Sequence, residues 1–163
     1  MLKHIALIMF LVGFYASPAS AQNAQQISTV KTGQSCAGCN LFQADLSYHE
    51  GQKMDLSKAR LRQSTLALST YDDVSFVEAN LSVSNLFGAR FNRGNFTGAN
   101  LQNVTAVGTY FGSSTLTGAN LQGANLSGAD LSLVKGLTQS QLDRACGDSS
   151  TRLPKGKTIS PCS

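Results

Sequence analysis

Large apolar side chains recur at every fifth position over most of this chain. Counting from Leu41 to Leu131 in steps of five gives 19 positions, here called the centres, and 17 of them are Leu, Phe or Tyr. The two exceptions are Gly51 and Ala106. A five-residue step rotates an α-helix by about 140° and sends successive side chains of a strand to opposite faces, so neither element buries all the centres. The backbone must therefore bend once per repeat.

Small residues keep the same phase two positions before each centre. Of these 19 positions, 17 hold Ala, Ser, Cys, Val, Thr or Gly, and the exceptions are His49 and Met54. A small side chain beside every large one indicates a close-packed interior layer. The undersized centre Ala106 follows the larger Val104, which predicts an exchange of volume within one such layer.

The types of residue at the centres predict how many repeats complete one turn. If four repeats close a coil, residues 20 apart stack, one column of centres is entirely leucine, and the five aromatic centres fall in only two others. These aromatic centres are Tyr71, Phe76, Phe91, Phe96 and Phe111. A three-repeat coil scatters the same aromatics over all its columns. We therefore expect a four-sided solenoid of nearly five coils, about 23 Å long at a coil spacing of about 4.8 Å.

The most regular stretch, residues 118–132, reads GANLQGANLSGADLS, and residues 78–82 read EANLS. This grammar, A-[DN]-L-x-x, resembles that of the pentapeptide-repeat family over residues 36–135. The resemblance implies a right-handed quadrilateral β-helix, with one short segment and one corner per repeat. The predicted fold is thus an all-β solenoid, a right-handed quadrilateral β-helix of pentapeptide repeats, closed by a short C-terminal α-helical cap.

Residues 1–21 are predicted to be a signal peptide. The basic start MLKH precedes the apolar run IALIMFLVGFY, and Ala19, Ser20 and Ala21 fit an A-x-A cleavage site. No later segment approaches the roughly 20 apolar residues that a membrane span needs. We therefore expect an exported protein, periplasmic or extracellular, with no transmembrane segment after signal cleavage. Residues 22–35 are polar and patternless, which predicts a flexible leader.

The chain after residue 135 carries the sequence features of a helix. These features are a capping box of Thr138 and Gln141, a hydrophobic staple of Leu137 and Leu142, and a stop at Gly147. Solenoid ends expose apolar interior and unpaired backbone, so they need covering. We expect a helix at about 139–146 that seals the last coil, within a C-terminal helix and disulfide-closed tail spanning residues 136–163.

Four cysteines lie beyond the predicted cleavage site, as two pairs at opposite ends of the repeats. They are Cys36, Cys39, Cys146 and Cys162. Oxidising compartments favour disulfides, and an even number of cysteines allows every one to be bridged. Bridged Cα atoms lie within about 7 Å, whereas the rod separates the two pairs by about 20 Å. We therefore predict two local disulfides, Cys36–Cys39 and Cys146–Cys162.

The C-x-x-C spacing of Cys36 and Cys39 also suits a thiol redox centre or half of a zinc site. A redox centre favours a βαβ context with the first cysteine at a helix N-terminus, and the sequence gives no such pattern. A zinc site needs two further ligands, and His49 alone does not supply them. A disulfide that staples the first coil is the favoured interpretation, and redox activity is the rival.

Charge restricts the partners that this chain can bind. The 163 residues carry a net charge of +4, but residues 36–135 hold seven basic and seven acidic side chains. The family resembled here includes acidic proteins that imitate DNA, which a neutral rod cannot do, so we expect no nucleic-acid partner. The one basic patch consists of Lys58, Arg60 and Arg62. It suits a solvated face, or alternatively an acidic partner or an anionic glycan.

Stacked residues of opposite charge are predicted to pair between coils. These pairs are Lys53 with Asp73, Asp73 with Arg93, and Lys58 with Glu78. Asp72 and Asp73 are adjacent in an extended segment, so their side chains point in opposite directions and cannot share a site.

The sequence predicts no catalytic residues, no metal site and no cofactor. We expect a rigid, non-enzymatic structural or protein-interaction module, with an unknown protein or envelope partner, as a monomer or homodimer. Two alternatives stay open. One is an envelope glycan or polymer binder that uses the flat polar faces, and the other is a thiol-disulfide redox protein that uses Cys36 and Cys39.

Overall fold

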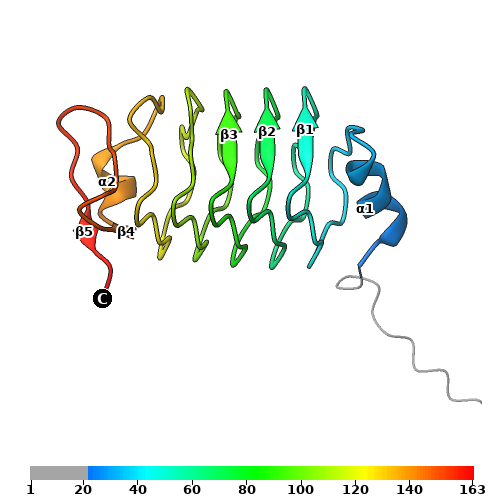
Figure 1. The fold of residues 1–163 in the computed structure, drawn as a ribbon, viewed down its shortest axis with the longest axis horizontal. Coiled ribbons are helices and arrows are strands. Elements are labelled where there is room, and N and C mark those ends of the chain that lie inside the picture. The colour runs from blue at the N-terminus through cyan, green and yellow to red at the C-terminus, as the bar shows by residue number, and fades with distance from the viewer. Residues whose placement is uncertain (1–21) are drawn as a thin grey trace, which may run out of the picture.

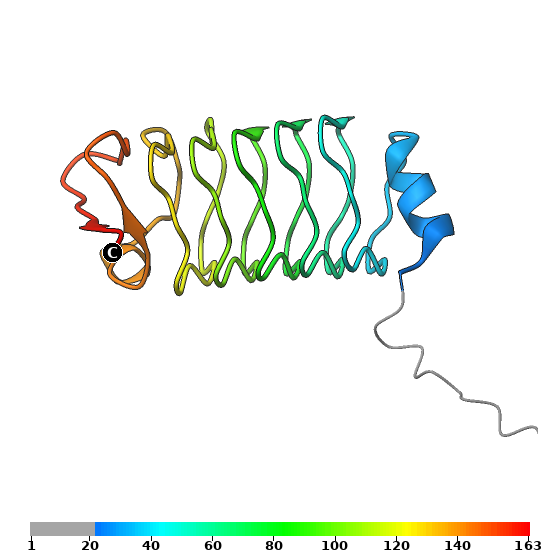
Figure 2. The ribbon, with the colours of Figure 1, turned by 60° about the horizontal axis from the view of Figure 1, so that its bottom comes forward.

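The computed structural model describes residues 22–163 as a rod of stacked coils, with a helix at one end and a helix and tail at the other (Figures 1 and 2). The predicted signal peptide lies outside the described residues. The elements, in order, are α1 (Ala24–Lys31), β1 (Glu50–Gln52), β2 (Thr70–Asp72), β3 (Arg90–Asn92), α2 (Gln139–Leu142), β4 (Cys146–Gly147) and β5 (Ser160–Pro161). Neither helix of residues 22–163 is long and apolar enough to cross a membrane.

Parallel pairing at an interval of 20 residues shows that four repeats make one coil. Glu50 of β1 lies opposite Thr70 of β2, which lies opposite Arg90 of β3. Single parallel bridges with the same interval join the other sides of consecutive coils, from Asn40–Arg60 to Thr115–Lys135. The predicted four-sided solenoid is therefore confirmed.

Each coil has four faces and four corners. We name a face by the residues that precede its centres, so that face 1 contains Asn80, face 2 Asn85, face 3 Arg90 and face 4 Asn95. A corner consists of the two residues after a centre. Face 3 is the one on which pairing extends into strands β1, β2 and β3.

The interior of the rod is filled by the centres. Phe76 stacks on Phe96 with 4.9 Å between ring centroids, and Phe91 stacks on Phe111 at 5.5 Å. Rings of the two columns also meet edge to face, as Phe91 and Phe96 do at 5.1 Å. These offset and T-shaped arrangements are the favourable ones for aromatic pairs. The predicted aromatic columns are thus present, and they form a continuous stack.

Two departures from the repeat compensate for each other in the interior. A Cβ atom added to Gly51 would lie 2.6 Å from the Tyr71 ring and 2.7 Å from the sulfur of Met54. The oversized Met54 therefore fills the volume that the missing centre at Gly51 leaves. Val104 and Ala106, which the sequence predicted to exchange volume, are both buried as well. Total volume per layer is kept while its distribution changes.

Hydrogen bonding at the corners explains the Asn or Asp of the repeat. The side chain of Asn80 accepts a hydrogen bond from the Ser82 backbone N–H at 3.0 Å, and Asp130 accepts one from Ser132 at the same distance. This local contact forms an Asx turn. The following corner residue then takes a positive φ, as at Gly98 (65°), which is the reason for the frequent glycine there.

The predicted flexible leader at residues 22–35 is wrong, because this segment contains helix α1. Asn23 caps the helix by accepting from the Gln26 N–H at 3.0 Å, and Val30 is fully buried against the first coil. The side-chain oxygen of Gln26 accepts from the backbone N–H of Asn40 at 2.7 Å. The helix forms because the first coil would otherwise expose its interior and its backbone groups.

The C-terminal helix is shorter than predicted. Helix α2 ends at Leu142 instead of continuing to residue 146, although its capping box is confirmed and Leu142 is fully buried. Gly147 is not a helix stop but lies in β4.

The tail after α2 continues the coil irregularly. Cys146 pairs with Asn125 and Arg152 with Asp130, at intervals of 21 and 22 residues. The Leu126 N–H donates to the Cys146 carbonyl at 2.8 Å. The last regular coil thus finds backbone partners in the tail, which a helix cannot supply.

Candidate functional site: the outer faces and the two ends of the rod

The outward side chains of the faces form fixed polar rows. Face 1 carries Asn80, Asn100 and Asn120 in consecutive coils, and the Asn120 amide donates to the Asn100 side-chain oxygen at 3.5 Å. The rows are held by parallel backbone pairing, so their spacing equals the coil spacing of about 4.8 Å. A row of this kind suits a ligand or protein with a matching repeat of polar groups.

Two open hollows interrupt this surface. One, of about 370 Å³, lies on face 3 and is lined by Glu50, Gly51, Gln52, Thr70 and Asp72. The other, of about 290 Å³, lies beside α2 and is lined by Gly118, Ala119, Asn120, Leu121, Gln122, Ser140, Gln141 and Arg144. Both offer amide, hydroxyl and charged groups that hydrogen-bond to polar ligands. Across residues 22–163, no cluster of three or more His, Cys, Asp and Glu side chains is placed to hold a metal ion.

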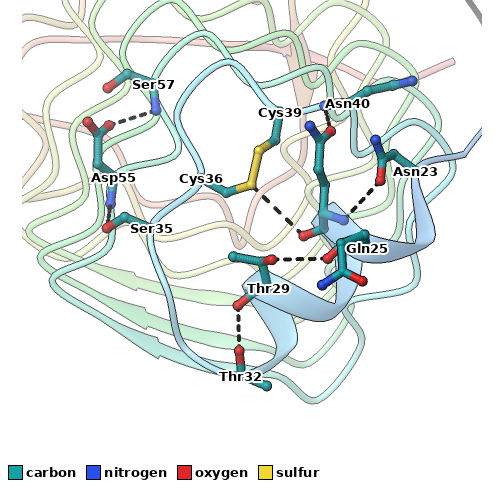
Figure 3. Close-up of a disulfide and its surroundings, with 11 residues drawn as sticks. Asn23, Gln25, Thr29, Thr32, Ser35, Cys36, Cys39, Asn40, Asp55 and Ser57 are labelled. Atoms are coloured by element: carbon teal, nitrogen blue, oxygen red, sulfur yellow. Dashed lines mark hydrogen bonds between the residues drawn. A yellow bond between two sulfur atoms is a disulfide. The ribbon is translucent and has the colours of Figure 1, made fainter.

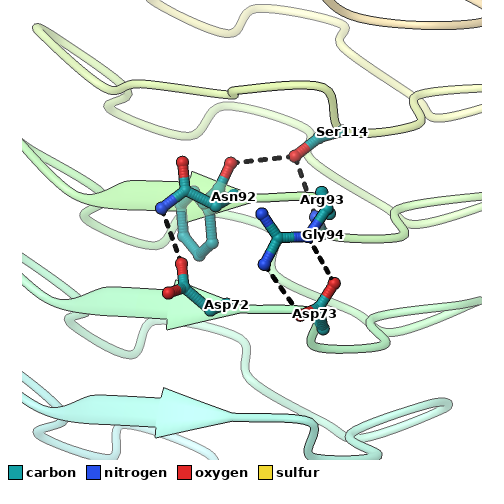
Figure 4. Close-up of polar contacts among 7 residues, drawn as sticks. Asp72, Asp73, Asn92, Arg93, Gly94 and Ser114 are labelled. Carbon is teal, nitrogen blue, oxygen red and sulfur yellow. Dashed lines mark hydrogen bonds and ion pairs between the residues drawn. The ribbon is translucent and has the colours of Figure 1, made fainter.

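Asp72 and Asp73 point to different partners, as predicted (Figure 4). Both Asp73 oxygens accept from the Arg93 guanidinium, at 2.6 and 2.8 Å, whereas Asp72 accepts from the Asn92 amide at 2.6 Å. The hydrogen bond from Arg93 lowers the pKa of Asp73. This arrangement is an ion pair between coils and not an acid–base pair.

Other aspartates of the rod belong to the turns. Hydrogen bonds from the backbone and hydroxyl of Ser47 lower the pKa of Asp45, and those from Ser57 lower the pKa of Asp55. A lowered pKa keeps a carboxylate ionised, which suits a hydrogen-bond acceptor and not a proton donor at neutral pH. These residues therefore serve the corners structurally.

The structure gathers the basic patch of Lys58, Arg60 and Arg62 along one side of one coil. Arg60 lies on face 1, and Lys58 and Arg62 occupy the two corners that border it. All three are exposed, but the Lys58 ammonium lies 3.7 Å from a Glu78 oxygen, the pairing that the sequence predicted. Part of the patch is thus neutralised by the next coil.

The structure contains the two predicted disulfides. Cys36 and Cys39 are bonded at the first coil, beneath α1, and are only 9% and 8% exposed (Figure 3). Cys146 is bonded to Cys162, which ties the end of the tail to the last coil. Thiol–disulfide exchange requires a thiolate to approach one sulfur, so cover by α1 favours a staple over a redox centre.

His49 occupies the interface between α1 and the first coil. Its Nδ1 lies 3.1 Å from the hydroxyl of Tyr71, a residue that is fully buried in the next coil. Burial lowers the pKa of His49, an effect that the backbone of Lys31 and Val30 at the end of α1 opposes in part. His49 therefore fits this interface as a neutral side chain.

This environment predicts a pH dependence of stability. The unfolded chain keeps the ordinary histidine pKa of 6.5, so it takes up a proton more readily than the folded chain does. The free energy of unfolding is expected to be nearly constant above about pH 7.5 and to fall progressively as the pH drops through 6.5, where the unfolded chain takes up its proton. Urea unfolding at about pH 7.5, 6.5 and 5.5 measures this. His49→Gln, which cannot titrate, should lose the decline over this range, and an unchanged decline would contradict the assignment.

Sequence reasoning missed one surface feature, a set of exposed apolar side chains at the corner between faces 2 and 3. Tyr48, Leu68 and Phe87 are 73%, 46% and 48% exposed. The detectable feature in the sequence was a large apolar residue one or two positions after a centre, where the repeat calls for polar residues or glycine.

Comparison of the sequence with known families finds the one described as Pentapeptide repeats. Eight copies of the repeat match, over residues 72–103 and 95–132. A search of curated protein sequences finds no match for the chain.

Several solved structures have a similar fold. A trypsin-treated form of QnrB1, a plasmid-mediated fluoroquinolone resistance protein, is 16% identical with a TM-score of 0.51, over 78% of this chain and 76% of that one. The alr5209 protein of Nostoc PCC 7120 is 19% identical over 81% and 95%, with a TM-score of 0.46. Rfr23 of the cyanobacterium Cyanothece 51142 is 20% identical over 79% and 97%, with a TM-score of 0.32. The likeness to QnrB1 supports a shared fold, and the low identities carry no statement about shared activity.

Proposed function

Because this chain is a pentapeptide-repeat protein that folds as a right-handed quadrilateral β-helix, we propose that it acts as an exported, rigid, non-enzymatic interaction module. It binds its partner through a fixed surface. The rod holds side chains at set intervals on four faces, and a partner contacts them without a conformational change in the rod.

One observation carries this proposal: the cysteines and several aspartates of the chain, which are potential catalytic groups, are already held in disulfides and turn hydrogen bonds around an apolar interior. The centres are apolar, the disulfides join all four cysteines, and Asp45 and Asp55, which precede their centres, accept turn hydrogen bonds. What remains for contact is the outer side chains on a hydrogen-bonded frame. Such pre-ordered groups lose little conformational entropy on binding, which favours recognition.

Export is supported by two independent features. The N-terminal segment has the basic, apolar and small-residue order of a signal peptide. The two disulfides are stable in oxidising compartments and rare in reducing ones.

The proposal predicts that cells producing the full chain release a mature form that begins at Gln22 and contains two disulfides. Cell fractionation with intact-mass analysis measures this, and Ala21→Tyr is the control that should block cleavage. In-cell crosslinking of the mature form should then capture an envelope component reproducibly. Retention in the cytosol with an intact N-terminus would contradict export, and absence of any crosslinked component would contradict the interaction role.

Variants of the basic patch locate the contact. Replacing Lys58, Arg60 and Arg62 by glutamine should reduce capture of an acidic partner. Replacing Lys135, Lys155 and Lys157 by glutamine changes the net charge equally at other places and should leave capture unchanged.

The double variant Cys36→Ser and Cys39→Ser should lower stability but keep partner capture. Loss of a disulfide-exchange activity at unchanged stability would instead support the redox alternative.

The hollow on face 3 favours a second candidate, an envelope glycan or polymer as the ligand. Its carboxylates, the Gln52 amide and the Thr70 hydroxyl are the kinds of group that hydrogen-bond to sugar hydroxyls. Binding to purified cell-wall polymer, compared between the wild type and the Gln52→Ala variant, tests this candidate directly.

A further inference from the structure

Apolar residues at the corner between faces 2 and 3 form one continuous ridge, in which Tyr48, Leu68 and Phe87 are exposed and the other members are half-buried. It consists of Tyr48, Ala67, Leu68, Phe87 and Val107, which lie in four consecutive coils. Backbone hydrogen bonds join them: the Tyr48 N–H donates to the Ala67 carbonyl at 3.0 Å, and the Leu68 N–H donates to the Phe87 carbonyl at 2.9 Å. The ridge is therefore a fixed feature of the frame.

No charged residue occupies this corner in the five coils that cross it, from residues 47 and 48 to residues 127 and 128. The other three corners each carry charge, for example Arg62, Lys58 with Glu78, and Asp73 with Arg93. An apolar strip of this length on an otherwise polar surface marks an interaction site.

The stability of the fold does not require large apolar side chains at this corner. Tyr48 and Leu68 have φ of 58°, a left-handed conformation that is unfavourable for residues other than glycine, asparagine and aspartate. The Leu68 side chain leans over Gly88, where a Cβ would lie 2.7 Å from its Cδ2, and it still remains 46% exposed. Val83 shares this conformation and exposure at another corner, so what points to a partner that covers the ridge is the continuity of the apolar strip over four coils without a charged residue.

We propose that the ridge is a self-association surface, on which a second copy of this chain packs antiparallel about a two-fold axis at Leu68. Such an axis runs across the rod and reverses its direction, so the coil of Glu50 meets the partner's coil of Arg90. Leu68 then lies against the same residue of the partner. The inference goes beyond the proposed function, since self-association and capture of an envelope component are independent properties.

The charges beside the ridge fit this symmetry. On face 3, Glu50 lies one coil before Thr70 and Arg90 one coil after it. An antiparallel pair therefore places Glu50 of each copy opposite Arg90 of the other, which gives two such charge pairs per dimer. The Arg90 guanidinium lies 4.7 Å from the centre of the Tyr110 ring, which holds it above the face before any partner binds.

A parallel arrangement fits poorly. A two-fold axis along the rod brings face 3 of one copy toward face 2 of the other at the same height. Glu50 would then approach Asp45 of the second copy, which places like charges across the contact. Charge thus selects the antiparallel pair.

The shapes of the ridge residues also match under the antiparallel symmetry. Phe87 faces the coil of Ser47, and Tyr48 faces the coil of Gly88, so a large residue meets a small one at each end. A two-fold contact requires such self-complementarity. The ridge is narrow, so we expect an interface at the small end of the range, with a dissociation constant in about the micromolar range.

Sedimentation equilibrium of the full chain at up to about 100 µM tests the proposal, because weak dimers populate at that concentration. The wild type is expected to dimerise. Leu68→Asn should weaken the dimer by about tenfold or more, since it removes the central apolar contact. Asparagine tolerates the left-handed conformation, so this variant should melt no lower than the wild type.

Val83→Asn is the matched control. Val83 has a φ of 59° and is 46% exposed, as Leu68 is, but it lies at another corner. This variant should leave the dimer unchanged. Either a monomeric wild type, or a dimer that Leu68→Asn and Val83→Asn affect equally, would overturn the proposal.

A charge exchange tests the antiparallel direction. Glu50→Arg and Arg90→Glu should each weaken dimerisation, and the double variant should restore it because the opposite charges meet again. Failure of restoration would overturn the antiparallel arrangement. If the wild type stays monomeric but Leu68→Asn loses an envelope component that Val83→Asn captures, the ridge binds another protein and self-association is wrong.

Discussion

Replacing Leu101 by aspartate is expected to abolish cooperative folding of the rod at room temperature. Leu101 is fully buried in the all-leucine column, and its backbone N–H donates a hydrogen bond to the Asn120 carbonyl of the next coil at 2.8 Å. A carboxylate there has no partner and no water. Burying such a group costs several kcal/mol, which is a large share of the roughly 5–15 kcal/mol that stabilises a typical domain. Thermal unfolding followed by far-ultraviolet circular dichroism measures the effect.

Asn100→Asp is the matched control for this variant. It adds the same carboxylate at the neighbouring position, but the side chain points outward and accepts the corner hydrogen bond from Gln102. Asp130 already occupies the same position of the repeat on face 3, where it accepts the hydrogen bond from Ser132. The control should melt within a few degrees of the wild type. If Leu101→Asp melts like its control, the assignment of the centres to the interior is wrong.

Removing a ring from the aromatic stack should give the second-largest loss. Phe96 is fully buried, and its ring centroid lies 4.9 Å from that of Phe76, 5.1 Å from Phe91 and 5.7 Å from Phe111. Phe96→Ala leaves a cavity inside a rigid frame that cannot collapse around it. We expect it to lower the free energy of unfolding by about 3–5 kcal/mol, as measured by urea denaturation.

Phe96→Leu separates the loss of volume from the loss of aromatic character. Leucine is the residue that most other centres carry, so it fits the frame and should cost less than about 1.5 kcal/mol. Equal losses for the alanine and leucine variants would show that ring geometry, and not volume, stabilises this layer.

The repeat alone was enough to predict the central rod. The period of five, the four-sided coil and the inward columns follow from residues that face the same surroundings in every coil, such as Leu81, Leu101 and Leu121. The capping box of Thr138 and Gln141 was also predictable from the sequence, because its hydrogen bonds join residues only three positions apart. The predicted disulfides followed from the separation of the two ends of the rod.

The candidate surface was predicted only in part. The sequence indicated two of the charge pairs between coils, Asp73 with Arg93 and Lys58 with Glu78, because residues 20 apart stack; the predicted pair of Lys53 with Asp73 is not among the ion pairs of residues 22–163. It did not indicate the hollow over Gly51, since that depends on how Met54 and Tyr71 fill the layer beneath. It also missed the ridge, because a single Leu68 at a corner is unremarkable until the next coils place Phe87 and Val107 beside it.

The sequence by itself thus determined the repeating part of this protein, where each residue has the same neighbours in every coil. The tertiary structure decided what happens where the repeat ends. Helix α1 is stable because the first coil needs a cover for Leu41 and its neighbours, and a short polar segment with Val30 supplies it. The tail extends the coil because its Cys146 backbone pairs with the Ala124 carbonyl and the Leu126 N–H, which would otherwise lack partners. Both depend on contacts between distant residues, which local patterns do not encode.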